Sequence, residues 1–179
     1  MLWRRLLRDR RGVSAVEFAL IAPLLLVLYA GLSELCQAMI AERRAGHVAS
    51  AVGDLVAQAE VVTINDLNDI FTIGKTIMNP FPQDQLKVCV TSVTADANKV
   101  TKVDWRRGSD GGACSTGSTV TIPLDLAEGD SVVMAETSYA YTSPIKYILP
   151  NALSFQETFY LRPRRSDKVV CNDCPPPTP

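Results

Sequence analysis

The chain has 179 residues, with 18 lysines and arginines, 19 aspartates and glutamates, and a formal net charge of −1. That length allows one ordinary domain with a short extension and excludes a multidomain enzyme. Hydrophobic residues make up 47% of the chain, which is enough to bury a core, so the composition is not that of a disordered protein. The single histidine, His47, argues against a Ser-His or Cys-His catalytic pair and against a histidine-rich metal site.

The charged residues are divided unevenly at residue 12. Residues 1–12 hold five arginines and one acid, a net charge of +4, whereas residues 13–179 hold 13 basic and 18 acidic side chains, a net charge of −5. An apolar stretch follows the basic head, and no charged residue occurs for 16 positions from Phe18 onward. A membrane-spanning helix needs about 20 mostly apolar residues. We therefore expect the span to extend over residues 13–41 and to include Glu17 and Glu34.

Three interpretations of this N-terminal pattern compete. A cleaved secretory signal peptide also has a basic head, but no A-x-A site follows the apolar stretch and the helical pattern continues. An uncleaved single-span anchor fits the pattern directly. The third interpretation rests on Glu17, because an acid in a membrane helix is costly and is usually paired or functional. The alternative for Glu17 is an interfacial acid that the helix dipole favours.

The orientation of the span follows from the basic residues on its two sides. Five arginines precede the span, and only Arg43 and Arg44 follow it closely. The positive-inside rule then places the N-terminus in the cytoplasm and the rest of the chain outside the inner membrane.

The order of residues around the start of the apolar stretch resembles a known family. The sequence RRGVSAVEFALIAPLLL, residues 10–26, is similar to the start of TadE/TadG-like pseudopilins. These are the minor pilins of the tight-adherence (Tad, or Flp-type) pilus, a branch of the type IV pilus superfamily. The resemblance is strongest over about residues 10–56, is weaker near the end of the chain, and carries no motif over about residues 64–125.

The resemblance implies a processing site and an assembly site. In the family a prepilin peptidase cuts after the glycine that precedes a Glu-Phe or Glu-Tyr pair, which here implies a cut between Gly12 and Val13. Glu17 and Phe18 would then be the fifth and sixth residues of the mature chain and would serve processing and assembly. The cut would create an α-amino group at Val13, and Glu17 of a neighbouring subunit would be able to pair with it.

The apolar stretch begins a long helix that the pattern extends to about residue 60. Its second half carries an apolar stripe with three- and four-residue spacing, which predicts packing on the exported domain or, alternatively, on a partner helix. The stripe consists of Val48, Val52, Leu55, Val56 and Ala59. A second, shorter helix is expected from Thr63 to Asn79, with Thr63 or Asn65 as its cap.

Strand patterns take over after Pro82. Residues 86–95 alternate between apolar and polar, and residues 99–106 form the return strand after a turn. Residues 119–124 are a candidate short edge strand, and a helical turn is expected at residues 144–150. Two further strands are expected at residues 130–142 and 152–162. The predicted fold class is α+β, with a long helix against one face of a small antiparallel sheet.

The resulting organisation has five parts. They are a basic leader (1–12), the transmembrane helix (13–41), an amphipathic continuation of that helix (42–62), an exported α+β domain (63–163) and a flexible, cysteine- and proline-rich tail (164–179).

Five cysteines are distributed unevenly along the chain. Cys36 lies near the outer end of the apolar helix and is interpreted as a small packing residue. The other four lie in the exported part, where disulfides are permitted, and four cysteines allow three pairings. From the spacing we favour Cys89 with Cys114 and Cys171 with Cys174.

The sequence offers little else that indicates chemistry. A redox CxxC motif usually lies at a helix N-terminus in a βαβ unit, whereas Cys171 and Cys174 lie in a proline-rich tail. A zinc site would need two more ligands, and the spacing of Cys89 and Cys114 does not suggest one. The acidic body gives little support to nucleic-acid binding. We therefore expect no catalytic residue, no cofactor and no metal.

The resemblance implies a structural role in pilus initiation, assembly, tip display or surface adhesion. The implied partners are the prepilin peptidase, other minor pilins, the major pilin, the inner-membrane assembly platform and the lipid bilayer. The implied location is the inner membrane, with the domain in the periplasm and later in the extracellular pilus. The alternatives are an uncleaved single-span envelope protein whose exported domain binds a partner and, less favoured, a periplasmic thiol oxidoreductase.

Overall fold

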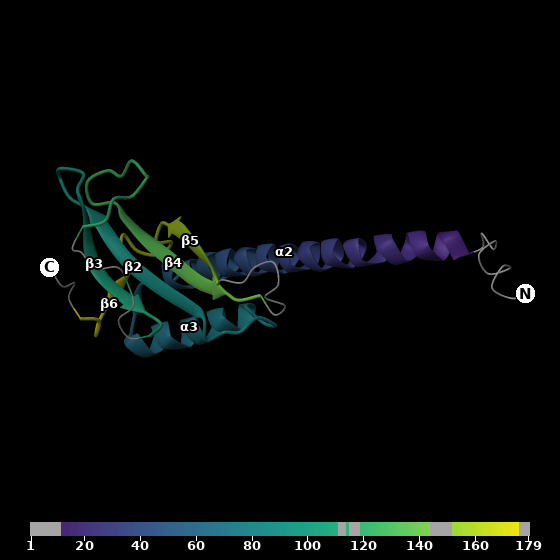
Figure 1. The fold of residues 1–179 in the computed structure, drawn as a ribbon. Coiled ribbons are helices and arrows are strands. Elements are labelled where there is room, and N and C mark those ends of the chain that lie inside the picture. The colour runs from purple at the N-terminus through teal and green to yellow at the C-terminus, as the bar shows by residue number, and fades with distance from the viewer. Residues whose placement is uncertain (1–11, 111–113, 115–118, 144–151, 176–179) are drawn as a thin grey trace, which may run out of the picture.

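The computed structural model describes residues 12–110, 114, 119–143 and 152–175. The elements in chain order are helix α2 (Val13–Ala57), strand β1 (Val61–Val62), helix α3 (Ile64–Ile77), and strands β2 (Leu86–Ala95), β3 (Thr101–Gly108), β4 (Ser131–Tyr141), β5 (Leu153–Leu161) and β6 (Val170–Cys171). The fold is α+β, with an N-terminal helix, a second helix and a four-stranded antiparallel sheet (Figure 1). The helical turn that the sequence predicts at 144–150 lies outside the described residues.

Helix α2 dominates the molecule. Its 45 residues make it about 68 Å long, and it continues through Pro23 without interruption. The N-terminal part projects away from the rest of the chain, whereas the C-terminal part lies against the sheet (Figure 1). Burial begins at Glu34 and recurs every three or four residues as far as Ala57, so one face of the second half belongs to the domain core.

The four-stranded sheet has the order β3-β2-β4-β5, and every neighbouring pair is antiparallel. Helix α2 packs on β4 and β5, and α3 packs against α2. The hydroxyl of Thr137 on β4 donates a hydrogen bond to the carbonyl of Ala45 at 3.1 Å, which ties sheet and helix together. Both helices thus cover one face of the sheet.

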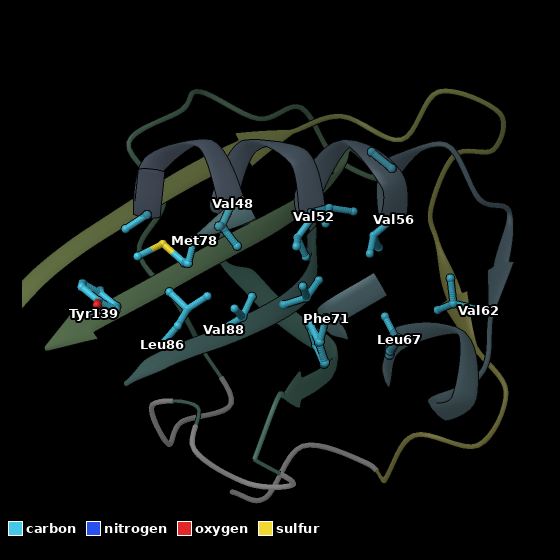
Figure 2. Close-up of a cluster of buried hydrophobic side chains, with 14 of the residues drawn as sticks. Val48, Val52, Val56, Val62, Leu67, Phe71, Met78, Leu86, Val88 and Tyr139 are labelled. Atoms are coloured by element: carbon cyan, nitrogen blue, oxygen red, sulfur yellow. The ribbon is translucent and has the colours of Figure 1, made fainter. Parts of the chain in front are cut away.

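The main core lies between the two helices and this face. Val48, Val52 and Val56 of α2 point toward Leu86 and Val88 of β2, and side chains of α3 complete the layer (Figure 2). These three valines are members of the predicted stripe. Leu55, which the sequence also placed in the stripe, lies off the buried face and is 40% exposed.

Two glycines allow the core elements to approach closely. A Cβ atom added at Gly53 of α2 would lie 2.5 Å from a methyl group of Leu161 and 3.1 Å from the Cβ of Ala135. A Cβ atom added at Gly74 of α3 would lie 2.7 Å from a methyl group of Val52. Ordinary contacts between carbon atoms are about 3.5–4.0 Å, so the helix packing leaves no room for a side chain at either position.

A second, smaller core lies on the opposite side of the sheet. It consists of Val93, Ala95, Val103, Leu126 and Val132. Residues of the long connection between β3 and β4 cover these side chains. The candidate strand at 119–124 contributes one isolated bridge, between Thr119 and Lys102, since the segment that contains Pro123 does not continue the ladder.

The C-terminal tail differs from the free extension that the sequence suggested. Strand β6 pairs in parallel with β1, Val61 with Val170 and Val62 with Cys171. Val169 is fully buried, and its carbonyl accepts a 2.8 Å hydrogen bond from the indole nitrogen of Trp105. A strand of two residues is too short to produce a periodic pattern, so it could not be recognised from the residues alone. Residues 164–175 therefore belong to the domain.

Candidate membrane and assembly site

The first turns of α2 hold the residues expected to serve processing and assembly. Gly12 occupies the N-cap position, and Val13 begins the helix. Val13 and Phe18 are 51% and 69% exposed, and Glu17 is exposed between them. The four residues lie at the end of α2 that is farthest from the sheet (Figure 1). Nothing in the described part of the chain covers them.

The exposed apolar side chains of α2 continue from these turns toward the domain. They include Phe18, Leu20, Ile21, Leu24, Leu25, Leu26, Val27, Leu28 and Leu32, all of them at least half exposed. Among the described residues, α2 is the one helix long and apolar enough to cross a membrane, and its most apolar stretch has no buried residue. A helix that leaves this much apolar surface uncovered is suited to lipid and not to water.

A buried acid marks the place where α2 enters the domain. Glu34 is 1% exposed, and its carboxylate accepts a 2.7 Å hydrogen bond from the hydroxyl of Ser143, which follows β4 and is equally buried. Burial, and then the nearby Glu34 carboxylate, raise the pKa of the Tyr141 hydroxyl. A buried charge is costly unless it is hydrogen-bonded, so this contact fixes the end of β4 against the helix.

The structure contains the two disulfides that the spacing favoured. The bond between Cys89 and Cys114 joins β2 to the connection after β3, and the bond between Cys171 and Cys174 closes a small ring after β6. Inside this ring the carboxylate of Asp173 accepts a 2.8 Å hydrogen bond from the backbone nitrogen of Ile64 and so caps α3. The remaining cysteine, Cys36, is free and exposed on α2.

One comparison identifies the N-terminal part of the chain. Residues 12–54 match the family model described as TadE-like protein. This segment is TadE-like. The match begins at Gly12 and ends three residues before the end of α2, so it covers both the projecting half of the helix and most of the half in the core. No curated protein and no solved structure matches the chain.

The resemblance of this chain to Tad pilus proteins therefore rests on α2. The TadE-like segment carries Gly12, Val13, Glu17 and Phe18, which are the residues that the sequence resemblance singled out. The sheet, α3 and the tail lie outside the match.

The open part of the sheet surface carries a shallow cleft of about 340 Å³. The disulfide between Cys89 and Cys114 lies at one side, and the carboxylate of Glu136 and the amine of Lys87 line it. Burial raises the pKa of Glu136, although Arg106 opposes this effect. The cleft presents polar groups to solvent on the side of the sheet that faces away from the TadE-like helix.

The possible metal ligands of the tail do not form a thiolate site. Cys171, Asp173 and Cys174 lie close enough together to hold an ion. The two sulfur atoms are bonded to each other, however, and the Asp173 carboxylate caps α3. Metal binding needs deprotonated thiols, so the structure assigns this group to folding.

Sequence reasoning treated Glu34 only as a charge within the span and did not find its contact with Ser143. A signal for it exists in the sequence. Small residues follow Glu34 at helical spacing on the same face, at Ala38, Ala41 and Ala45, and all of them are buried. This row places Glu34 on the packing face of the helix. Its partner, Ser143, could not be predicted, because it lies more than 100 residues away in the sequence.

Proposed function

We propose that this protein is a minor pilin, or pseudopilin, of a tight-adherence pilus, and that a prepilin peptidase processes it after Gly12. The observation that carries the proposal is the match to TadE-like proteins over residues 12–54, which begins at the glycine of the implied cut. TadE-like pilins are structural proteins, and the chain is anchored in a membrane through α2. Its own role is therefore structural, and its exported domain is carried by the helix.

The proposed processing step removes the basic leader. Hydrolysis of the amide between Gly12 and Val13 leaves a carboxylate on Gly12 and an ammonium group on Val13. The leader carries a net charge of +4 and holds the N-terminus in the cytoplasm until the cut. After the cut the protein has 167 residues and a side-chain charge of −5. The charge that orients the chain is thus separated from the charge that is exported.

The proposed assembly step uses Glu17. An acid near the middle of a membrane helix costs about 2.5–3.5 kcal/mol, and the cost is smaller near an end. In the mature chain Glu17 lies about one turn from the ammonium group of Val13. When processed helices lie side by side, this carboxylate pairs with the ammonium group of a neighbour. The pairing favours other pilins over lipid as neighbours. The proposed partners are therefore the major pilin and the inner-membrane assembly platform.

The size of the domain favours a minor component. About 120 residues follow α2, and they form a complete sheet with two cores. The abundant pilins of this pilus branch are much shorter. We therefore propose that the protein initiates, caps or decorates a thin pilus, in which its domain contributes to surface attachment.

The direct test is the N-terminal sequence of protein extracted from membranes of cells with and without the prepilin peptidase. We expect the chain to begin at Val13 when the peptidase is present and to keep its leader when it is absent. A Gly12→Leu variant should keep the leader in both strains, and Gly46→Ala serves as the control, because Gly46 lies far from the cut. An intact leader in cells that contain an active peptidase would overturn processing and support an uncleaved envelope protein.

A further inference from the structure

The apolar surface of α2 extends past the point where the domain begins. Glu34, Ala38 and Ala41 are buried against the domain on one side of the helix. Over the same turns the other side carries three large apolar side chains, Leu35, Met39 and Ile40, which are 47–53% exposed. We refer to these three as the apolar collar. The collar continues the exposed apolar surface of the projecting half, and no exposed charged residue lies between the two.

Charged residues begin directly above the collar. Glu42 and Arg43 are exposed, and the guanidinium of Arg44 donates hydrogen bonds to the carbonyls of Ile77, at 2.9 Å, and Asn79. The helix surface therefore changes from apolar to charged within one turn. Arginines whose stems lie along apolar surface and whose heads reach water are typical of the membrane–water boundary.

The length of the helix below this boundary fits a bilayer. Residues 13–41 are about 44 Å long, which matches the bilayer with both of its polar headgroup layers, about 40–45 Å. The span then ends where the charges begin. The apolar collar lies in its last turns, at the outer headgroup layer and the adjoining edge of the hydrocarbon core.

We propose that the outer leaflet of the bilayer covers the apolar collar, so that the exported domain stands with its lower edge in the lipid headgroups. This placement explains why the turns around Glu34 have two different surroundings. At that depth its carboxylate faces the domain and Ser143, whereas the opposite side of the same turns faces lipid. The inference rests on membrane anchoring through α2 and does not depend on processing or on pilus assembly.

The free thiol of Cys36 provides a probe at the right depth. Cys36 is exposed on the turn that carries Leu35, and the other described cysteines are in disulfides, so an environment-sensitive fluorophore attaches here without reductant. The full chain is reconstituted in vesicles of phosphatidylcholine and phosphatidylglycerol that contain no other pilus component. Two variants made on a Cys36→Ser background, Leu28→Cys and His47→Cys, place the same label about 12 Å deeper and about 16 Å higher along the helix.

We expect the label on Cys36 to behave like the label at position 28 toward water-soluble iodide and to be quenched by lipids brominated near the headgroup. The label at position 47 should be quenched by iodide and not by the brominated lipids. Iodide quenching at Cys36 equal to that at position 47 would overturn the proposal. Protection of Cys36 from both quenchers would also overturn it, because a second copy of the chain would then cover the collar. Failure of processing or assembly in cells would leave these results unchanged.

Discussion

Glu17 and Glu34 are the two acids within the apolar half of α2, and their surroundings differ completely. Glu34 is buried and receives a hydrogen bond from Ser143 within its own chain. Glu17 is exposed at the far end of the helix. An acid that is satisfied inside its own chain serves the fold. An acid exposed in an apolar span is costly unless it finds a partner, and this contrast supports the proposed role of Glu17 in assembly.

At the scale of single residues we predict that Glu17→Gln lowers assembly and leaves membrane insertion intact. Charged hydrogen bonds contribute about 1.5–3 kcal/mol, so recruitment into pili should fall by roughly tenfold or more. Insertion is read from the carbonate-resistant membrane fraction, and assembly from the amount of sheared pili. Glu42→Gln is the matched control, because Glu42 is exposed on the same helix above the apolar collar. Equal losses of insertion and assembly would contradict the assigned role.

At the scale of elements, the distance between the two helices is set by small residues. Gly74 of α3 faces Val48 and Val52 of α2, both of which are fully buried and have little freedom to move. Gly46 of α2 faces Glu157 and Phe159, and a Cβ added there would meet its nearest neighbour at 3.7 Å, an ordinary contact. We therefore expect an alanine to have different effects at the two positions.

We predict that Gly74→Ala destabilises the domain and that Gly46→Ala does not. Overpacking a core costs about 1–3 kcal/mol, whereas replacing a glycine inside a helix by alanine contributes up to about 1 kcal/mol of helix stability. The net effect should be unfavourable at Gly74 and neutral to favourable at Gly46. Denaturant unfolding of the full chain in detergent, followed by tryptophan fluorescence, measures both variants. Equal stability of the two variants would show that the helices separate easily.

The elements also show which parts of the fold the sequence could predict. Strand β2 has the predicted bounds, 86–95, because alternation over ten residues is a strong signal and turns flank it. The pairing of β6 with β1 was beyond prediction, because it depends on the burial of Val169 beside Trp105, two residues 64 positions apart. For the candidate site, the family resemblance singled out the Gly12–Phe18 end of the helix, which lies inside the matched segment, and the roles of these residues stay a prediction. It missed the contact between Glu34 and Ser143, which only the folded chain creates.

At the scale of the whole molecule, the tail closes the domain around the end of α2. The backbone nitrogen of Arg164 donates to the carbonyl of Ala57 at 2.9 Å, and the guanidinium of Arg164 lies 2.6 Å from the carboxylate of Asp54. Strand β6 and the cap that Asp173 provides extend these contacts to the start of α3. The tail thereby joins both helices and, through Trp105, the sheet.

We predict that a chain ending at Arg165 is several kcal/mol less stable than one ending at Pro175. The shorter chain loses the burial of Val169, worth about 1.5–3 kcal/mol, and leaves the indole nitrogen of Trp105 without its acceptor, at a cost of about 1–3 kcal/mol. The longer chain loses only residues outside the described fold and should match the full-length protein. Unfolding midpoints in detergent compare the three chains. Equal midpoints would show that the tail contributes nothing to stability.

Helix α2 passes from the apolar span into the domain core without a hinge, and this has a mechanical consequence. In the proposed pilus, a force along the filament axis would enter the domain through the helix itself. The contacts of α2 with β4 and β5 lie side by side along the helix, so an axial pull loads them together in shear instead of opening them one after another. The same continuous helix passes a rotation at the membrane directly to the sheet. We therefore expect an axial load on α2 to reach the sheet without passing through a flexible joint.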